Sequence, residues 1–200
     1  LVLVASGGVS REVNPGLRLA STPLADLFLP LLKIPPVRLT AMAGIELLRR
    51  SGTDLGRDAE ELSRVLDALP DVAARGAFSR TLRSVVDWRG QVVTMLDRSY
   101  LAEAMPVLLM WGAHDAVIPV SHALVAHEAM PGSQLEVFPD AGHSPHHQDP
   151  ERFMELLATF VASTESVDFD RDRWRRLLRD GRDGLGEGTP AELSVEPDET

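Results

Sequence analysis

Two short loops in the second half of the chain carry the side chains best suited to proton transfer. They read GAHDAVIP at residues 112–119 and PDAGHSPH at residues 139–146, and each follows an apolar run that predicts a strand. If these strands are parallel neighbours, both loops leave the same edge of the sheet, where ligands bind. Asp115 then fixes the imidazole tautomer of His143 and stabilises the imidazolium formed during proton transfer. The spacing predicts a general base, His143, with an orienting carboxylate, Asp115.

Strands and helices alternate around these loops. The run PVLLMW at residues 106–111, bounded by Pro and Gly, is typical of a strand buried on both faces of a parallel sheet. The remaining elements predicted in this part of the chain are a helix at 121–130, a strand at 134–138 and a helix at 150–161. With a further strand at residues 1–5, the pattern predicts the α/β class.

The segment between these parts is predicted to be helical and irregular. Prolines punctuate residues 15–36, and each tends to start or stop a helix. Thr53 and the apolar residues up to Leu69 predict one capped amphipathic helix. Apolar residues from Leu82 to Leu96 predict another helical face, weakened by Gly90. No strand is predicted between Val9 and Met105.

Composition limits the classes of partner. Twenty basic and 30 acidic side chains give a net charge of −10, which disfavours nucleic acid and anionic membrane surfaces. Cysteine is absent, and no apolar run approaches the ~18 residues that a membrane span needs. No basic stretch precedes the apolar run at residues 1–5, so a cytoplasmic location is favoured. The oligomeric state stays open.

The C-terminal part differs in composition from the rest. Residues 165–200 hold eleven acidic side chains and six arginines. Trp174, Leu177 and Leu178 form the apolar stripe of a short helix. From Gly181 onwards the chain is rich in Gly, Pro and acids, so it cannot bury enough apolar surface to offset its ordering entropy. A disordered acidic tail is therefore predicted.

The motif G-x-x-D-x-x-x-P after a buried strand, followed by a strand and A-G-H, resembles the C-terminal half of an α/β-hydrolase. The likeness covers residues 1–163. It implies a core strand at 1–10, a helical cap at 11–95, the C-terminal part of the core at 96–163, and a short helix with the tail at 164–200. It also implies Asp115 as the catalytic acid, His143 as the base, and hydrolysis of a small apolar ester or other activated carbonyl without cofactor or metal.

One part of the family pattern is missing. The family places its nucleophile in a G-x-S-x-G elbow that precedes the acid and the histidine, and no such pentapeptide occurs here. We expect the chain to begin after the elbow, with a nucleophile, Ser in the simplest case, further upstream. An Asp there would instead favour epoxide or halide chemistry. The 200 residues alone are then expected to be inactive.

Some of these residues also fit a nucleophile or a metal site. Ser6 follows a strand and precedes both Asp115 and His143, but Val4 stands where the elbow needs glycine. The cluster of histidines at 143–147 with Asp149 could hold a metal, although adjacent side chains in extended chain point in opposite directions. The pair His114-Asp115 is similar to that of metal phosphohydrolases of the HD type, which need further ligands on helices.

Two further hypotheses concern the cap and the chain as a whole. Apolar side chains of the cap could line a substrate pocket, or could simply pack between helices; they are Met42, Phe78, Trp88, Met95 and Tyr100. The segment at residues 88–91 could act as a hinge of the cap. Alternatively, the whole chain is a non-catalytic binding module that uses an exposed sheet edge.

Overall fold

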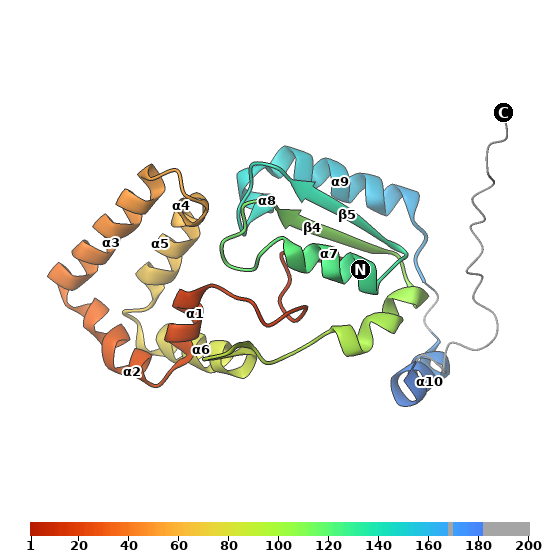
Figure 1. Cartoon of the computed structure of the whole chain (residues 1–200), viewed down its shortest axis with the longest axis horizontal. Helices are drawn as coiled ribbons and strands as arrows, with labels where there is room; N and C mark the ends of the chain where they lie inside the picture. Colours follow the sequence, from red (N-terminus) through yellow and green to blue (C-terminus); the bar gives the residue numbers. More distant parts are fainter. Residues whose placement is uncertain (168–169, 182–200) are drawn as a thin grey trace.

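The computed structural model describes residues 1–167 and 170–181. Within these residues the central feature is a parallel sheet with strand order β1-β4-β5. Its strands are β1 (Val2–Val4), β4 (Val107–Gly112) and β5 (Ser133–Phe138). Helices connect the strands and cover the sheet (Figure 1), so the α/β class expected from the sequence is confirmed.

The two faces of β4 pack against different helices, because successive side chains of a strand point to opposite sides. One set of alternate residues packs with α7 (Ser121–Ala129) and the other with α9 (Pro150–Ser163). The first set is Val107 and Leu109, and the second is Leu108 and Met110. All six residues of β4 are buried, which accounts for its uninterrupted apolar run.

A group of helices between β1 and β4 lies beside the sheet (Figure 1). Residues 11–95, which include these helices, are called the cap below, as a name for the segment and not for a function. Proline occupies the first turn of several of them, where a missing N–H costs nothing. The elements are α1 (Pro15–Ser21), α2 (Leu24–Phe28), η1 (Leu29–Lys33), α3 (Pro35–Arg50), α4 (Asp54–Arg57), α5 (Ala59–Ala68) and α6 (Val72–Val85). The irregular helical character predicted for this segment is what the structure describes.

Two details of this segment differ from the prediction. The single helix expected after Thr53 is split into α4 and α5 at Asp58. Just before the split, α4 lies close to the end of α3: a Cβ on Gly56 would lie 2.3 Å from the carbonyl oxygen of Leu48. The chain must pass Leu48 at this point, and it turns before α5 begins.

The helical face expected from Leu82 to Leu96 is also wrong. After α6 the chain forms an antiparallel hairpin of β2 (Val86–Asp87) and β3 (Gly90–Gln91). Gly90 has φ +125°, which L-residues avoid, and its Cβ would lie 1.9 Å from the carbonyl oxygen of Arg11. Gly90, which would weaken a helix, is therefore needed for the hairpin. Residues 88–91, which the sequence suggested as a hinge, are part of this hairpin.

Beyond the hairpin, η2 (Leu96–Ala104) leads back to β4, and α10 (Arg171–Asp180) packs against it. The fully buried Leu177 contacts Tyr100 and Ala104, as does Trp174 at the margin of the same cluster. The predicted short helix is thus present and docked. Residues 182–200, for which disorder is predicted, lie outside the described residues.

Among the residues that the structure describes, no single helix has the length and apolar character to cross a membrane. The pair Leu24–Lys33 and Pro35–Arg50, bent by 102°, meets the test of length and composition only when taken together. The predicted boundaries of cap, core and tail at residues 10, 95 and 163 stay predictions.

Candidate active site

The loops that follow β4 and β5 leave the same edge of the sheet, because the parallel strands are paired as far as Gly112 and Phe138. They bring Asp115 and His143 together: the imidazole Nδ1 lies 2.9 Å from the carboxylate Oδ2. The Asp115 side chain is fully buried, whereas that of His143 is 32% exposed. A carboxylate can only accept a hydrogen bond, so the proton on the neutral imidazole lies on Nδ1. Nε2 is then free to take a proton.

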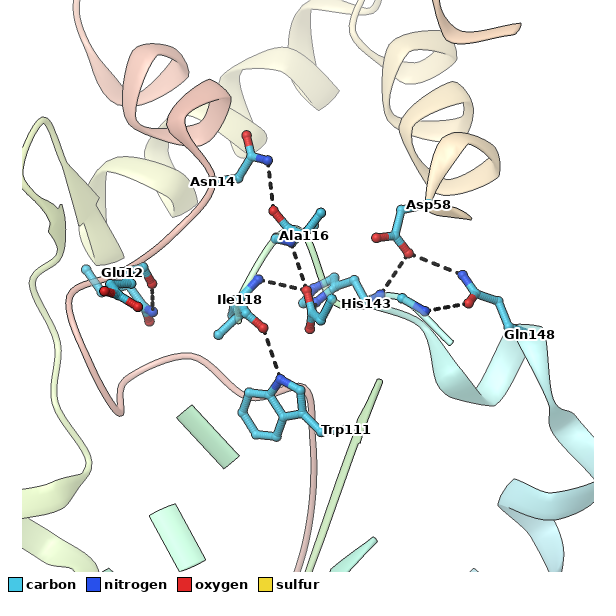
Figure 2. Close-up of polar contacts among 12 residues, drawn as sticks. Glu12, Asn14, Asp58, Trp111, Ala116, Ile118, His143 and Gln148 are labelled. Atoms are coloured by element: carbon cyan, nitrogen blue, oxygen red, sulfur yellow. Dashed lines mark hydrogen bonds and ion pairs between the residues drawn. The ribbon is translucent and has the colours of Figure 1, made fainter. Parts of the chain in front are cut away.

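The Asp115 carboxylate is held by its own loop. Its Oδ1 accepts hydrogen bonds of 2.8 Å from the backbone N–H groups of both Val117 and Ile118. The carbonyl of Ile118 in turn accepts the indole N–H of Trp111 at 3.0 Å (Figure 2). Trp111 is fully buried, as the sequence predicts. The loop is thus anchored to the core, and Oδ2 is left for the imidazole.

The surroundings of His143 make it a stronger base than an ordinary histidine. Burial lowers the pKa of its imidazole, whereas the hydrogen bond and the charge of Asp115 raise it. The carboxylates of Asp58 and Glu61 raise it further, so the net pKa lies above the usual value. A base with these properties takes up a proton readily and is stabilised as the imidazolium.

Two glycines let the loops approach each other closely. A Cβ on Gly112 would lie 2.0 Å from the carbonyl oxygen of Gly142 and 2.4 Å from that of Ala141. At this crossing the backbone N–H of His114 donates to the Ala141 carbonyl at 3.0 Å. The tight loops expected from these glycines are therefore packed backbone against backbone, which fixes the distance between acid and histidine.

A cavity of about 460 Å³ lies between the sheet edge and the cap, and His143 is on its wall. Most of its lining is apolar, and Gln91 is the other large polar side chain there. The lining residues are Ala5, Gly7, Gly8, Val13, Leu17, Leu82, Val85, Val86, Gln91, Val93, Val117, Ile118 and His143. Such a space suits an apolar group bound beside a base.

The five cap residues suggested for such a pocket do not line this cavity in the described structure. Phe78 packs on the cluster around Val13, and Met95 packs on the sheet core. Tyr100 contacts Leu177, while Trp88 is 67% exposed beneath the guanidinium of Arg89. The Met42 sulfur is 3.9 Å from the Ser63 hydroxyl. Packing between elements, the alternative given for these residues, describes Phe78, Met95 and Tyr100. Trp88 is largely exposed and fits neither hypothesis.

The metal hypotheses find no matching geometry. Within the described residues, no group of three or more His, Asp or Glu side chains could hold a metal ion. His146 and His147 pack edge to face, with ring centroids 4.2 Å apart, and burial lowers the pKa of His146. His114 lies 2.8 Å from Asp54 at the surface. Ser6 is half-buried and is not part of the cavity wall beside His143.

Sequence reasoning missed one residue of the site, Asp58. Its side chain comes from the turn between α4 and α5 and is 2% exposed. Oδ1 accepts hydrogen bonds from the backbone N–H of His143 at 2.8 Å and from Nε2 of Gln148 at 3.2 Å (Figure 2). An aspartate just before a helix ordinarily indicates the N-cap residue of that helix. The pattern alone therefore gives no sign of a contact with a residue 85 positions away.

Comparison with known proteins finds a family of hydrolases and individual relatives. The sequence profile of the Alpha/beta hydrolase family matches residues 1–156. An uncharacterized protein of Mycobacterium tuberculosis (strain ATCC 25618 / H37Rv) is 50% identical over 183 residues, which are 90% of this chain and 54% of the relative. The pimeloyl-[acyl-carrier protein] methyl ester esterase of Xanthomonas oryzae pv. oryzae (strain MAFF 311018) is 31% identical over 134 residues, 59% of this chain and 53% of the esterase.

Among solved structures, a meta-cleavage product hydrolase from Pseudomonas fluorescens IP01 is similar, with a TM-score of 0.52 and 21% identity. The match covers 80% of this chain and 54% of the hydrolase, and it shows a common fold. The chain therefore spans about half the length of the relatives and of the solved structure that it matches.

Proposed function

The chain belongs to the alpha/beta hydrolase family, and we propose that it supplies the acid and the base of an ester-hydrolysing active site. The observation that carries this proposal is the 2.9 Å contact between Asp115 and His143 on the wall of an apolar cavity. Asp115 is the catalytic acid and His143 the general base. The similarity to a methyl ester esterase supports an ester as the substrate class.

The nucleophile of this proposal lies outside the 200 residues. The chain has no G-x-S-x-G pentapeptide, and the similar esterase is about twice as long as the part that is matched. A serine supplied by a preceding segment would bring with it the backbone N–H groups that bind the oxyanion. The 200 residues are then the C-terminal part of the catalytic unit and are inactive by themselves.

The reaction then proceeds in two steps without a cofactor. His143 Nε2 takes the proton of the serine hydroxyl while the serine oxygen attacks the ester carbonyl. The imidazolium that forms is stabilised by Asp115. Collapse of the tetrahedral intermediate breaks the bond to the alcohol, which leaves with the proton from His143. In the second step a water gives its proton to His143 and attacks the acyl group, which releases the carboxylic acid and restores the serine.

The cavity also suggests the type of ester. With a volume of about 460 Å³ and an apolar wall, it suits a small to medium apolar group rather than a charged or sugar-like one. Gln91, the other large polar side chain of the wall, has its amide bound to the Gly8 N–H and the Glu12 carbonyl, so His143 is the polar group of the wall assigned to the chemistry.

The test compares this chain with the same chain joined to the coding sequence that precedes Leu1, read for an in-frame G-x-S-x-G. Both are assayed with p-nitrophenyl esters of increasing acyl length. The extended protein is expected to hydrolyse the shorter apolar esters, and the chain alone is not. His143→Ala in the extended protein should reduce kcat/KM by on the order of 10⁴-fold.

His127→Gln is the matched control, because His127 lies on α7 and contacts Ser133 rather than the site. It should leave the rate unchanged. Wild-type ester cleavage by His143→Ala would overturn the assignment of the base. An extended protein that cleaves no ester, or an upstream sequence without a nucleophile, would favour the binding-module hypothesis instead.

A further inference from the structure

Asp58 is a buried carboxylate whose contacts reach from the cap to the histidine loop. Its Oδ1 accepts the two hydrogen bonds from His143 N–H and Gln148 Nε2. Its Oδ2 is buried and has no hydrogen-bond partner among the described residues. Two other side chains of the cap contact these loops: Asp54 contacts His114, and Arg57 donates to the Asp140 carbonyl. Both are exposed to solvent, whereas the carboxylate of Asp58 is buried.

Packing around Asp58 leaves no room for adjustment. A Cβ on Gly142 would lie 2.5 Å from Oδ1 and 2.8 Å from Oδ2 of Asp58. Gln148 closes the same loop: its Oε1 accepts the Gly142 N–H at 2.7 Å, and its Nε2 also donates to the Arg57 carbonyl at 3.1 Å. The N–H of His143 is therefore bound directly to Asp58, and the N–H of Gly142 is linked through the Gln148 side chain to the turn between α4 and α5.

The electrostatic position of Asp58 is unfavourable for a purely structural residue. Burial raises the pKa of its carboxyl, the N–H of His143 lowers it, and the negative charge of Asp115 raises it, with a net rise. Asparagine would accept the same two hydrogen bonds without a buried charge. A charge retained under these conditions is typical of functional sites.

We propose that Asp58 is a positioning residue for His143: the cap carboxylate holds the histidine loop at the distance and orientation in which the imidazole contacts Asp115. This proposal rests on the proposed function for the role of the imidazole as a base. Because the negative charge of Asp58 also faces the ring, it favours the imidazolium that forms during proton transfer.

The groups around the imidazole come from several elements. Asp115 faces it from the loop after β4, and Asp58 and Glu61 from the turn before α5 and from α5 itself. His146 of α8 (Pro145–Gln148) also interacts with it, because His143 lowers the pKa of His146. Asp58 is the carboxylate among these that also holds the histidine's own backbone, so it can be separated from the others by substitution.

The experiment uses Asp58→Asn and Asp58→Ala, with Asp54→Asn as the control for an exposed acid of the same cap segment. The imidazole pKa of His143 is followed by two-bond ¹H–¹⁵N NMR in this chain, and the signal is assigned by its loss in His143→Gln. Asp58→Asn keeps the acceptor and removes the charge, so the pKa of His143 should move down. Asp54→Asn should leave it unchanged.

Unfolding at several pH values separates a charge effect from a merely structural one. A carboxyl with a raised folded pKa adds stability that is present below its unfolded pKa of about 4 and lost as the pH rises through the folded pKa. The stability of Asp58→Asn relative to the parent should therefore increase between pH 4 and pH 7. A hydrogen-bonding role alone predicts a difference that does not depend on pH.

In the extended protein, Asp58→Ala should lower kcat/KM by about 10²-fold, because a misplaced base loses its productive geometry, with a smaller effect on KM. Asp58→Asn should be intermediate. The proposal is overturned if Asp58→Asn leaves the pKa of His143 unchanged, or if folded Asp58→Ala has the parent rate. A pKa shift in an extended protein that cleaves no ester would instead contradict the proposed function and leave the contact between Asp58 and His143 standing.

Discussion

The two oxygens of the Asp115 carboxylate have different partners. Oδ1 is held by two backbone N–H groups of its own loop, and Oδ2 contacts the imidazole of His143. The acid is thus held by its own loop, residues 113–120, whereas His143 lies on the shorter loop of residues 139–144. Its backbone is fixed from outside, by Asp58. The pair therefore depends on residues far from either motif.

At the residue scale, the sharpest prediction concerns Gly142. Gly142→Ala places a Cβ against both oxygens of Asp58, and a shift of that carboxylate would disturb its hydrogen bonds with His143 and Gln148. We expect the free energy of unfolding to fall by about 1–3 kcal/mol, as for other overpacked sites. Gly132→Ala, where nothing lies within 4 Å of the new Cβ, should stay within ~0.5 kcal/mol of the parent. Urea denaturation measures the free energy of unfolding of both variants. Equal stability of the two would contradict the close contact between Gly142 and Asp58.

Sequence reasoning could find Asp115 and His143 because each lies a few residues after an apolar strand, which is local information. It could not find Asp58, because the partner of this residue is 85 positions away and depends on the angle at which the cap docks. For the same reason the sequence left open whether residues such as Trp88 line a pocket or pack between helices; Trp88 is 67% exposed and does not line the cavity beside His143. Residue type and helical spacing do not specify which face meets the sheet.

At the scale of elements, strands and helices were predicted correctly where burial requires a run of consecutive apolar residues. The six buried residues of β4 and the alternate packing of α7 and α9 follow from an apolar run between Pro and Gly. The hairpin of β2 and β3 has two residues in each strand and no such run. Its position is set by Gly90, whose close approach to Arg11 is a tertiary contact. Short elements of this kind are invisible to periodicity.

The docking of α10 can be tested at the same scale. Leu177 is fully buried against η2, whereas its neighbour Leu178 is 53% exposed. We expect Leu177→Ala to lower the free energy of unfolding by about 2–5 kcal/mol, and Leu178→Ala to change it by less than ~0.5 kcal/mol. Thermal and urea unfolding give the comparison. Equal effects of the two substitutions would mean that α10 does not pack on η2 in solution.

At the scale of the whole molecule, one segment joins the sheet to the cap and to the acid loop. Asn14 donates its side-chain amide to the Ala116 carbonyl at 2.9 Å (Figure 2). Its backbone N–H donates to the Val117 carbonyl, also at 2.9 Å. Gln91 of the hairpin binds the same segment from the other side, at Gly8 and at the Glu12 carbonyl. The cap is therefore held over the sheet edge at a second place besides the contact of Asp58.

Substitution of Gln91 tests whether this second attachment sets the position of the cap. Gln91→Ala leaves the buried N–H of Gly8 without its acceptor, and one unsatisfied buried group costs about 1–3 kcal/mol. We expect unfolding free energy to fall by that amount and hydrogen exchange to quicken in α1 and in the hairpin, while β4 stays protected. Arg89→Ala removes an exposed side chain of the same hairpin that stacks on Trp88, so it serves as the control and should alter neither quantity. If exchange in α1 is as slow in Gln91→Ala as in the parent, the contacts of Gln91 do not set the position of the cap, and those of Asn14 and Asp58 hold it without them.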